Sequence, residues 1–186
     1  MRLLSLTLLV LWGAPALATE VSVDADTDTG LISWQTEQAG IQVRLTQITA
    51  DQARAFYRAR GFSATAAEHY VDECVFMTVV RNIGDTPIEH RLADWRYLAP
   101  GQAPRAIRSK REWEHTWQEL KVKDAARIAF TWAQLPTTQT FSPGDWNQGM
   151  TTYKVPRAAP FDLRFAWHAG GKIHSGMINA VRCSDE

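Results

Sequence analysis

Cysteine is scarce in this chain of 186 residues, and neither sign of charge is in excess. Twenty basic side chains balance 20 acidic ones, so the strongly basic footprint of a nucleic-acid-binding protein is missing. A local basic cluster is more typical of a solvated edge than of a phosphate site: Arg105, Arg108, Lys110 and Arg111. Beyond the N-terminal segment no run of 18 consecutive apolar residues occurs, so we expect no membrane span in the mature protein.

The motifs of common enzyme classes are missing as well. The sequence contains no glycine-rich phosphate loop, no HExxH and no GxSxG. The five histidines are scattered along the chain, and no local pattern sets a nucleophile beside a base. Asp145-Trp146 could mark a carbohydrate site, but such a pair in a turn more often caps the turn and covers the core. We therefore expect a protein that is not an enzyme.

The N-terminus has the three parts of a secretory signal peptide. Arg2 supplies a positive charge, an apolar segment follows, and Ala16-Leu17-Ala18 fits cleavage after a small residue. The apolar segment is shorter than the roughly 20 residues that span a bilayer. We expect removal of residues 1–18 and a periplasmic or secreted protein of 186 − 18 = 168 residues. That length suits a polar leader at 19–30 followed by one domain at 31–186.

Cys74 and Cys183 are the two cysteines of the chain. In an exported protein such a pair predicts a disulfide bond, with free thiols or a metal site as the alternatives. Their separation excludes a CxxC redox motif.

Short alternating apolar runs dominate the rest of the chain. Ile41, Val43 and Leu45 recur at period two, which is typical of a half-buried strand. Residues 74–80 are apolar on both faces, which indicates a central strand covered by a second sheet and by helices. A later strand carries an inward row: Phe161, Leu163, Phe165 and Trp167. About seven such strands separated by turns predict a mainly β, immunoglobulin-like antiparallel β-sandwich.

Helical spacing interrupts this pattern early in the chain. Thr49-x-x-Gln52 and Thr65-x-x-Glu68 have the spacing of capping boxes, and Gly61 can supply a left-handed stop. We predict a short helical insertion at about 49–73, between early strands. Residues 110–120 fit either a helix or an extended connector.

A further strand is predicted within ARIAFTWAQL. Ile128, Phe130 and Trp132 alternate there with smaller or polar residues.

Three segments resemble the telokin-like, immunoglobulin-fold domains of bacterial exported proteins: VFMTVVRNIGDTPIEHRLADWRYL, TFSPGDWNQGMTTYKVP and FDLRFAW. The matching features are Asn82, Gly84-Asp85-Thr86-Pro87, Trp95, Pro143-Gly144, Pro156 and the apolar strand that follows. The resemblance covers about half of the mature chain, and the helical insertion and Cys183 depart from it. It implies a buried Trp95 and a binding or accessory module without a shared set of catalytic residues.

The helical insertion is the candidate partner-binding surface. RAFYRARGF mixes aromatic residues with arginines, a composition favoured at interface hot spots. The candidate residues are Phe56, Tyr57, Arg58, Arg60 and Phe62. We expect a protein partner in the cell envelope. The alternative is that the insertion only covers one end of the core, with its aromatic side chains buried.

Copper binding is the alternative function. His174 and Met177 lie on the last predicted strand, and His168 and Met150 could lie nearby; imidazole and thioether groups suit copper in an oxidising compartment. Positions 174 and 177 of a regular strand face opposite ways, so this site requires a bulge near Gly176. The sequence thus favours a non-enzymatic periplasmic or secreted binding or accessory module, with copper binding or delivery as the second hypothesis.

Overall fold

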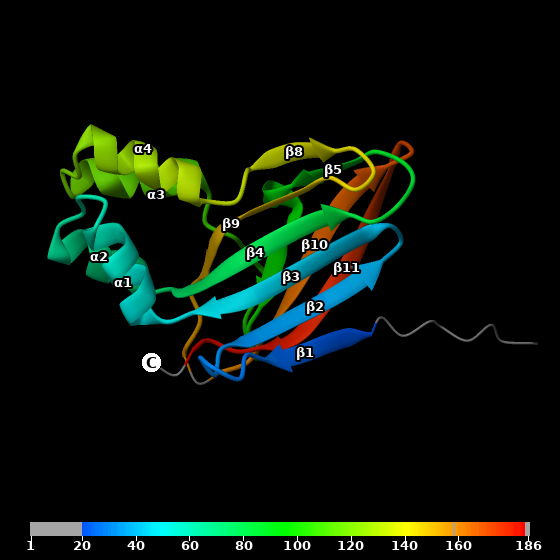
Figure 1. Cartoon of the computed structure of the whole chain (residues 1–186), viewed down its shortest axis with the longest axis horizontal. Helices are drawn as coiled ribbons and strands as arrows, with labels where there is room; N and C mark the ends of the chain where they lie inside the picture. Colours follow the sequence, from blue (N-terminus) through cyan, green and yellow to red (C-terminus); the bar gives the residue numbers. More distant parts are fainter. Residues whose placement is uncertain (1–19, 158, 185–186) are drawn as a thin grey trace, which may run out of the picture.

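The protein is described by a computed structural model that covers residues 20–157 and 159–184. The predicted signal peptide therefore lies outside the described residues. Within the described ranges the chain is mainly β, with two antiparallel sheets and four short α-helices. Figure 1 shows the helices gathered at one end of the strands. In these ranges, no helix combines the length and the apolar character needed to cross a bilayer.

The first sheet has the strand order β1-β2-β3-β4-β9. Its strands are β1 (Val21–Ala25), β2 (Ile32–Gln38), β3 (Ile41–Ile48), β4 (Cys74–Asn82) and β9 (Trp146–Tyr153). The segment expected to be a loose leader therefore contains an edge strand, since β1 pairs with β2 over its whole length. Backbone pairing alone can hold such a strand at an edge while most of its side chains stay exposed, so its polar sequence gave little sign of it.

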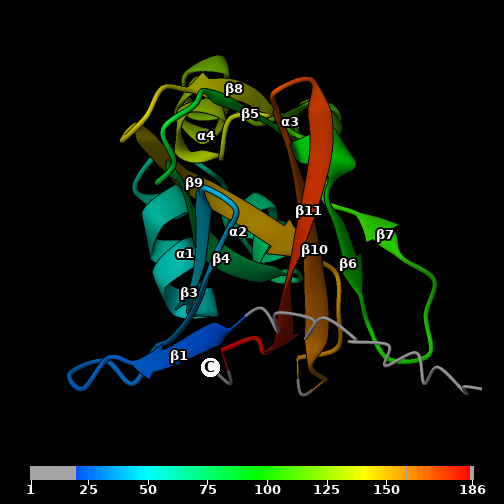
Figure 2. The ribbon, with the colours of Figure 1, turned by 90° about the vertical axis from the view of Figure 1, so that its right-hand side faces the viewer.

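The second sheet is built around β10 (Phe161–Ala169). Its other strands are β5 (Ile88–Arg91), β6 (Arg96–Leu98), β7 (Arg105–Ala106), β8 (Thr138–Phe141) and β11 (Lys172–Val181). Strand β11 pairs with one edge of β10, and the opposite edge is shared by β6 and β5. A short 3-10 helix, Leu92–Asp94, connects β5 to β6. Figure 2 shows β10, β11 and β6 on one side of the molecule and β3, β4 and β9 on the other.

The main hydrophobic core lies between these two sheets. The predicted inward row of β10 is confirmed, because all four side chains are buried: Phe161, Leu163, Phe165 and Trp167. Trp95 is buried as well and belongs to the same core. The sulfurs of Cys74 and Cys183 are bonded, which joins the start of β4 to the segment after β11.

The beginning of strand β4 is covered on both faces, as its sequence predicts, whereas Met77 and Val79 on the outer face are only partly buried. Phe76 faces the core between the sheets, whereas Val75 belongs to a second hydrophobic cluster beneath the helices. The helix layer at this end of the strands consists of α1 (Ala50–Arg58), α2 (Ala64–Val71), α3 (Lys110–Glu119) and α4 (Asp124–Ala133).

The insertion predicted at about 49–73 is confirmed as α1 and α2. The Thr49–Gln52 capping box forms with both of its hydrogen bonds. The predicted cap at Thr65 is wrong, because the Ser63 side chain accepts the hydrogen bond from the Ala66 N–H at 3.1 Å. Gly61 adopts a left-handed φ of 90°, so the chain has already turned when it reaches Ser63 and the helix begins two residues early.

Helices α3 and α4 answer one open question and correct one prediction. The segment that fitted a helix or a connector is helix α3. The strand predicted through residues 128–132 is instead helix α4, in which Ala126 and Phe130 face inward four residues apart. Ile128 and Trp132 supplied the apparent alternation, but they are 60% and 84% exposed.

The end of α4 is joined to the first sheet by a close backbone crossing. The N–H of Leu135 donates to the carbonyl of Met150 at 3.1 Å. A Cβ atom at Gly149 would lie 2.1 Å from the Leu135 nitrogen, so only glycine permits this approach. The crossing fixes the helix layer to β9.

Candidate ligand-binding cavity

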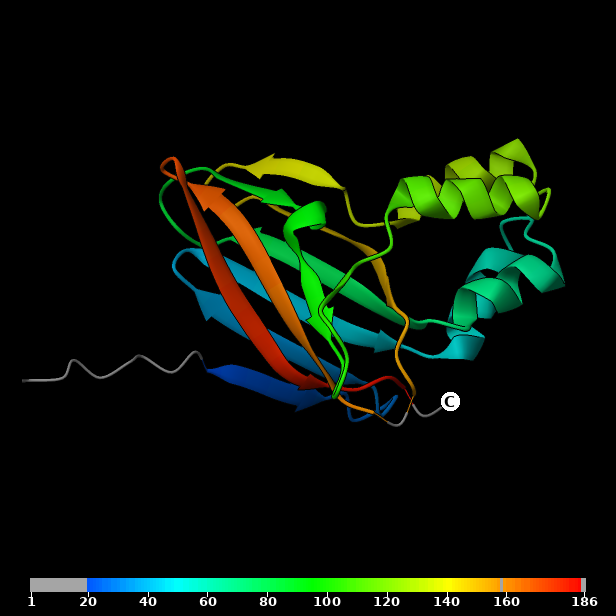
Figure 3. The same ribbon diagram turned by 180° about the vertical axis from the view of Figure 1, so that it is seen from behind.

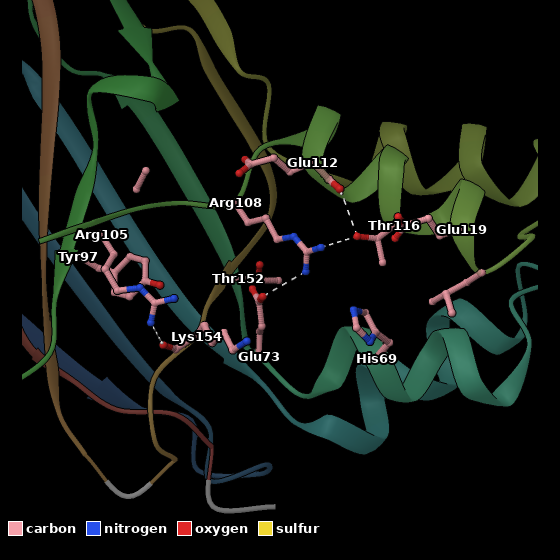
Figure 4. A pocket seen from close by; sticks show the side chains of 12 residues that line it. His69, Glu73, Tyr97, Arg105, Arg108, Glu112, Thr116, Glu119, Thr152 and Lys154 are labelled. Atoms are coloured by element: carbon pink, nitrogen blue, oxygen red, sulfur yellow. Dashed lines mark hydrogen bonds and ion pairs between the residues drawn. The ribbon is translucent and has the colours of Figure 1, made fainter. Parts of the chain in front are cut away.

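A cavity of about 520 Å³ lies between the helix layer and the ends of the strands. We call it the interlayer cavity; Figure 3 shows the helix layer beside the strand ends, and Figure 4 shows the lining side chains. Its principal polar side chains are Glu73, Tyr97, Arg105, Arg108, Thr152 and Lys154. These residues come from four stretches of the chain (73, 97, 105–108 and 152–154), which the fold brings together.

Arg108 is held in place by the start of α3. Ser109 and Glu112 form a capping box, so Arg108 directly precedes the N-cap of α3. The guanidinium carbon of Arg108 lies 3.7 Å from the centre of the Trp113 ring, and one nitrogen donates to the Thr116 hydroxyl. Because Trp113 and Thr116 lie on the buried face of α3, this arginine is directed into the cavity rather than into solvent.

Glu73 places a carboxylate in the base of the cavity. It lies between α2 and β4, next to the disulfide-bonded Cys74, and only 7% of the residue is exposed. Arg108 approaches its Oε1 at 3.3 Å. The Oε2 atom accepts no hydrogen bond from any residue in the described ranges. A buried carboxylate with one long ion pair therefore keeps capacity to accept further hydrogen bonds.

Arg105 and Lys154 form a basic wall on the strand side. Arg105 is paired with Tyr97 in the β6–β7 ladder and donates to the backbone carbonyl of Lys154 at 2.9 Å. The Lys154 ammonium group makes no hydrogen bond or ion pair with a residue that the structure describes. Burial raises the pKa of the Tyr97 phenol, so its hydroxyl stays protonated near neutral pH and can donate.

Thr152 contributes a hydroxyl group that the fold does not satisfy. The residue is 2% exposed, and within the described chain its Oγ1 has no hydrogen-bond partner. Figure 4 places it beside Glu73 and the guanidinium of Arg108. A buried polar atom without a partner costs about 1–3 kcal/mol, so this hydroxyl lowers the stability of the fold.

The predicted partner-binding residues divide into a buried and an exposed group. Tyr57 and Phe62 are buried inside the helix layer, and the Tyr57 hydroxyl accepts a hydrogen bond from Gln134 at 2.7 Å. Phe56, Arg58 and Arg60 remain at the surface: Phe56 is partly covered by the Arg60 guanidinium, whose carbon lies 3.3 Å from the ring centre, and Arg58 and Arg60 are exposed. These three residues are the ones that a protein partner could touch.

The candidate copper ligands are not brought together. His174 stacks on Trp167 on the inner face of the second sheet, with ring centres 5.4 Å apart, whereas His168 and Met177 lie on its outer face. Met150 belongs to the other sheet, beneath the helices. The bulge that this site requires near Gly176 is absent, because the β10–β11 register is regular there and shifts only nearer the end of β11.

Metal-ligand geometry is not found elsewhere in the described ranges either. Across residues 20–157 and 159–184, no three His, Cys, Asp or Glu side chains are grouped so that they could hold one metal ion.

Sequence reasoning missed the interlayer cavity. The basic cluster at 105–111 was expected to be a solvated edge, which is wrong for Arg108, whose side chain is only 26% exposed. One local signal was available: Arg108 directly precedes a capping box, and Trp113 five residues later offers a ring on the inner face of α3. Glu73 had no comparable signal, since its burial follows from α2 and β4 meeting at that point.

Comparisons with known proteins give little information. A scan of protein-family models finds no match, and neither does a search of curated proteins. Among solved structures, this chain is similar to the yjhA protein from Bacillus subtilis at 14% sequence identity with a TM-score of 0.34. That similarity covers 50% of this chain and 56% of the other. The chain therefore spans little more than half of that protein, and the likeness supports no conclusion about function.

Proposed function

We propose that this chain is a non-enzymatic binding module of the periplasm or extracellular space, and that it binds a small polar ligand in the interlayer cavity. In this proposal the two sheets serve as an immunoglobulin-like frame. The observation that carries it is the buried Glu73 carboxylate, which holds one 3.3 Å ion pair and keeps an unused oxygen within a cavity of about 520 Å³. Cavities of roughly 300–1,000 Å³ with a few convergent polar groups are typical of small-molecule sites.

The energetics of the cavity support the same proposal. Charged and polar groups are unfavourable inside a protein unless they are matched, and sites of function are where such mismatches are retained. Here the buried Glu73 carboxylate, with one oxygen that accepts no hydrogen bond, lines the same space as the exposed and unpaired Lys154 ammonium. A polar ligand would supply a partner for each of these two groups.

Export is the second part of the proposal. It is supported by the signal-peptide pattern of the sequence and by the bond between Cys74 and Cys183, since disulfides persist in oxidising compartments. Expression of the full chain in a bacterium, followed by fractionation and mass measurement, tests this part. We expect a mature protein that begins at Thr19 outside the cytoplasm. An uncleaved chain in the cytoplasm would contradict it.

Ligand binding can be tested by thermal shift on the mature chain. The panel should contain sugars, amino acids with short peptides, polyamines, dicarboxylates and inorganic phosphate. A ligand at 100 times its Kd stabilises the native state by about 2.7 kcal/mol, which raises Tm by several degrees.

Two lysine variants localise the effect. Lys154→Gln removes the unpaired ammonium of the cavity, and Lys172→Gln is the matched control at the distant β10–β11 turn. We expect at least one class to raise Tm in the wild type and in the control but not in Lys154→Gln. If no class does so, the protein does not bind a small polar ligand in this cavity.

A further inference from the structure

The charges of the interlayer cavity are divided between two walls. Arg105 and Lys154 project from the strand side, whereas Glu112 and Glu119 belong to α3 on the helix side, where Arg108 is already paired with Glu73; Figure 4 shows these positions. Glu73 lies in the base between them. Opposite charges held on opposite walls favour a ligand that carries both signs, because complementary charge determines which partner is accepted.

The basic wall is not neutralised by the acidic one. Neither Arg105 nor Lys154 forms an ion pair with a carboxylate of the described chain. The Arg105 guanidinium is oriented by its hydrogen bond to the Lys154 backbone carbonyl, and the Lys154 side chain lines the same cavity. This arrangement fits a carboxylate, which accepts hydrogen bonds from both.

The acidic side keeps one oxygen for a cation. Arg108 is shared between Glu73, the Thr116 hydroxyl and the Trp113 ring, and its contact with Glu73 is 3.3 Å long. Glu112 is occupied by the capping box of α3, and Glu119 lies 3.3 Å from His115 on the exposed helix face. Glu73 is therefore the carboxylate best placed to receive an ammonium group.

The size of the cavity limits the ligand. A cavity of about 520 Å³ falls within the roughly 300–1,000 Å³ of small-molecule sites, a size that suits a ligand no larger than a di- or tripeptide. The Tyr97 hydroxyl adds a neutral hydrogen-bonding group that suits a peptide amide.

From these contacts we infer that the ligand is a zwitterion, a short peptide or related amino acid with a free ammonium and a free carboxylate. The ammonium pairs with Glu73 and the carboxylate with Arg105 and Lys154. The inference rests on the proposed function, since it names the class of ligand for the same cavity.

The test uses trialanine in four forms, with binding to the mature chain measured by titration calorimetry. The forms have both ends free, an acetylated N-terminus, an amidated C-terminus, or both ends blocked. We expect the free peptide to bind at least tenfold more tightly than either singly blocked form, and the doubly blocked form to bind weakest. Equal affinities across the set would overturn the inference.

Two variants assign the ends of the ligand. Glu73→Gln should weaken the free and the amidated peptides, which carry the ammonium, but not the acetylated one. Lys154→Gln should weaken the free and the acetylated peptides but not the amidated one. Lys154 is exposed, so its variant stays informative even if Glu73→Gln fails to fold.

The two proposals can fail separately. If another class of the thermal-shift panel binds in a Lys154-dependent way and trialanine does not bind, the zwitterion inference is wrong and the proposed function stands. If no class binds, both are wrong.

Discussion

The indole nitrogen of Trp95 donates a hydrogen bond to the backbone carbonyl of Ala166 at 3.0 Å. Ala166 lies on β10, whereas Trp95 lies just before β6. The ring packs against Phe165, with ring centres 5.8 Å apart, and against His90 at 5.5 Å. One side chain therefore joins the centre of the second sheet by both packing and a hydrogen bond.

We expect Trp95→Ala to lower the free energy of unfolding by about 3–5 kcal/mol, as for other large buried aromatic side chains. Trp95→Phe should cost less, about 1–3 kcal/mol, because the ring is retained in part and the Ala166 carbonyl loses its donor. Trp132→Ala is the matched control: that side chain is 84% exposed, and its loss should change stability by less than about 0.5 kcal/mol. Urea denaturation measures all three. A cost below about 1 kcal/mol for Trp95→Ala would contradict the packing described above.

The disulfide predicts a thiol count and a stability change. Denatured, unreduced protein should contain no free thiol; a count of two would show that the bond does not form. The bridge closes a loop with a sequence separation of 109, so replacing both cysteines by alanine should cost about 4–5 kcal/mol if the effect is mainly chain entropy. Urea denaturation of the double variant measures this cost.

Thr152→Val should stabilise the protein by about 1 kcal/mol, because it removes a buried hydroxyl without a partner and keeps the shape of the side chain. Thr78→Val is the matched control: the Thr78 hydroxyl lies 2.6 Å from the Thr151 hydroxyl, and its loss should cost about 1–2 kcal/mol. In thermal denaturation without ligand, the melting temperature should therefore rise for Thr152→Val and fall for Thr78→Val. A loss of stability in Thr152→Val would mean that its hydroxyl has a partner after all.

Acid should destabilise the protein partly through His90. The residue is fully buried, its Nε2 lies 2.7 Å from the Pro136 carbonyl, and its Nδ1 has no partner in the described chain. Burial lowers the pKa of this imidazole below its ordinary 6.5. As the pH falls below 6.5, His90 therefore binds a proton in the unfolded chain but not in the folded chain. The free energy of unfolding decreases until the pH reaches the lower pKa that His90 has in the folded protein.

His90→Gln gives the measurement for this effect. Glutamine can still donate to the Pro136 carbonyl, but it does not titrate. Between pH 7.5 and 5 we expect the free energy of unfolding to fall more steeply for the wild type than for the variant. Parallel curves would show that His90 does not contribute to the pH dependence.

In the helix layer, buried residues such as Tyr57 stabilise the fold, whereas exposed residues such as Arg58 can contact a partner. Tyr57→Phe should cost about 1 kcal/mol, because it removes a buried hydroxyl bonded to Gln134. Arg58→Ala should leave stability almost unchanged, since the side chain is exposed and makes one 3.2 Å bond to the Phe62 carbonyl. If an envelope protein docks on this surface, Arg58→Ala should weaken its capture from an envelope extract while the melting temperature stays constant. Unchanged capture would leave α1 and α2 with a covering role only.

Local sequence patterns correctly predicted the elements whose buried residues recur at a regular spacing or whose ends carry a capping motif. The alternation in β10 and the capping box of α1 were both confirmed, because each signal lies within a few neighbouring residues. Helix α4 was mistaken for a strand because Ile128 and Trp132 are large, apolar and exposed, so they imitate a period of two. Hydrophobic periodicity assumes that apolar side chains face inward, and these two do not.

The cavity could not be predicted in the same way. Glu73, Arg108 and Thr152 are far apart in sequence, and no spacing rule links them. Their proximity follows from the packing of the helix cluster on Val75 of β4 and Met150 of β9. Chemistry assembled by tertiary contacts leaves no local motif.

The two faces of β4 contribute to two different hydrophobic clusters. The core between the sheets contains no residue of the four described α-helices, whereas the helix cluster uses Val75 and Met150 of the first sheet as its floor. The helices can therefore open locally while Phe76 stays buried between the sheets. If the sheets separate, however, the helices lose the strand residues on which they pack. Amide hydrogens of α1 to α4 should accordingly exchange with solvent through smaller openings than those of β3 and β4. The helix side of the interlayer cavity thus belongs to the part of the molecule that opens at the lowest free energy.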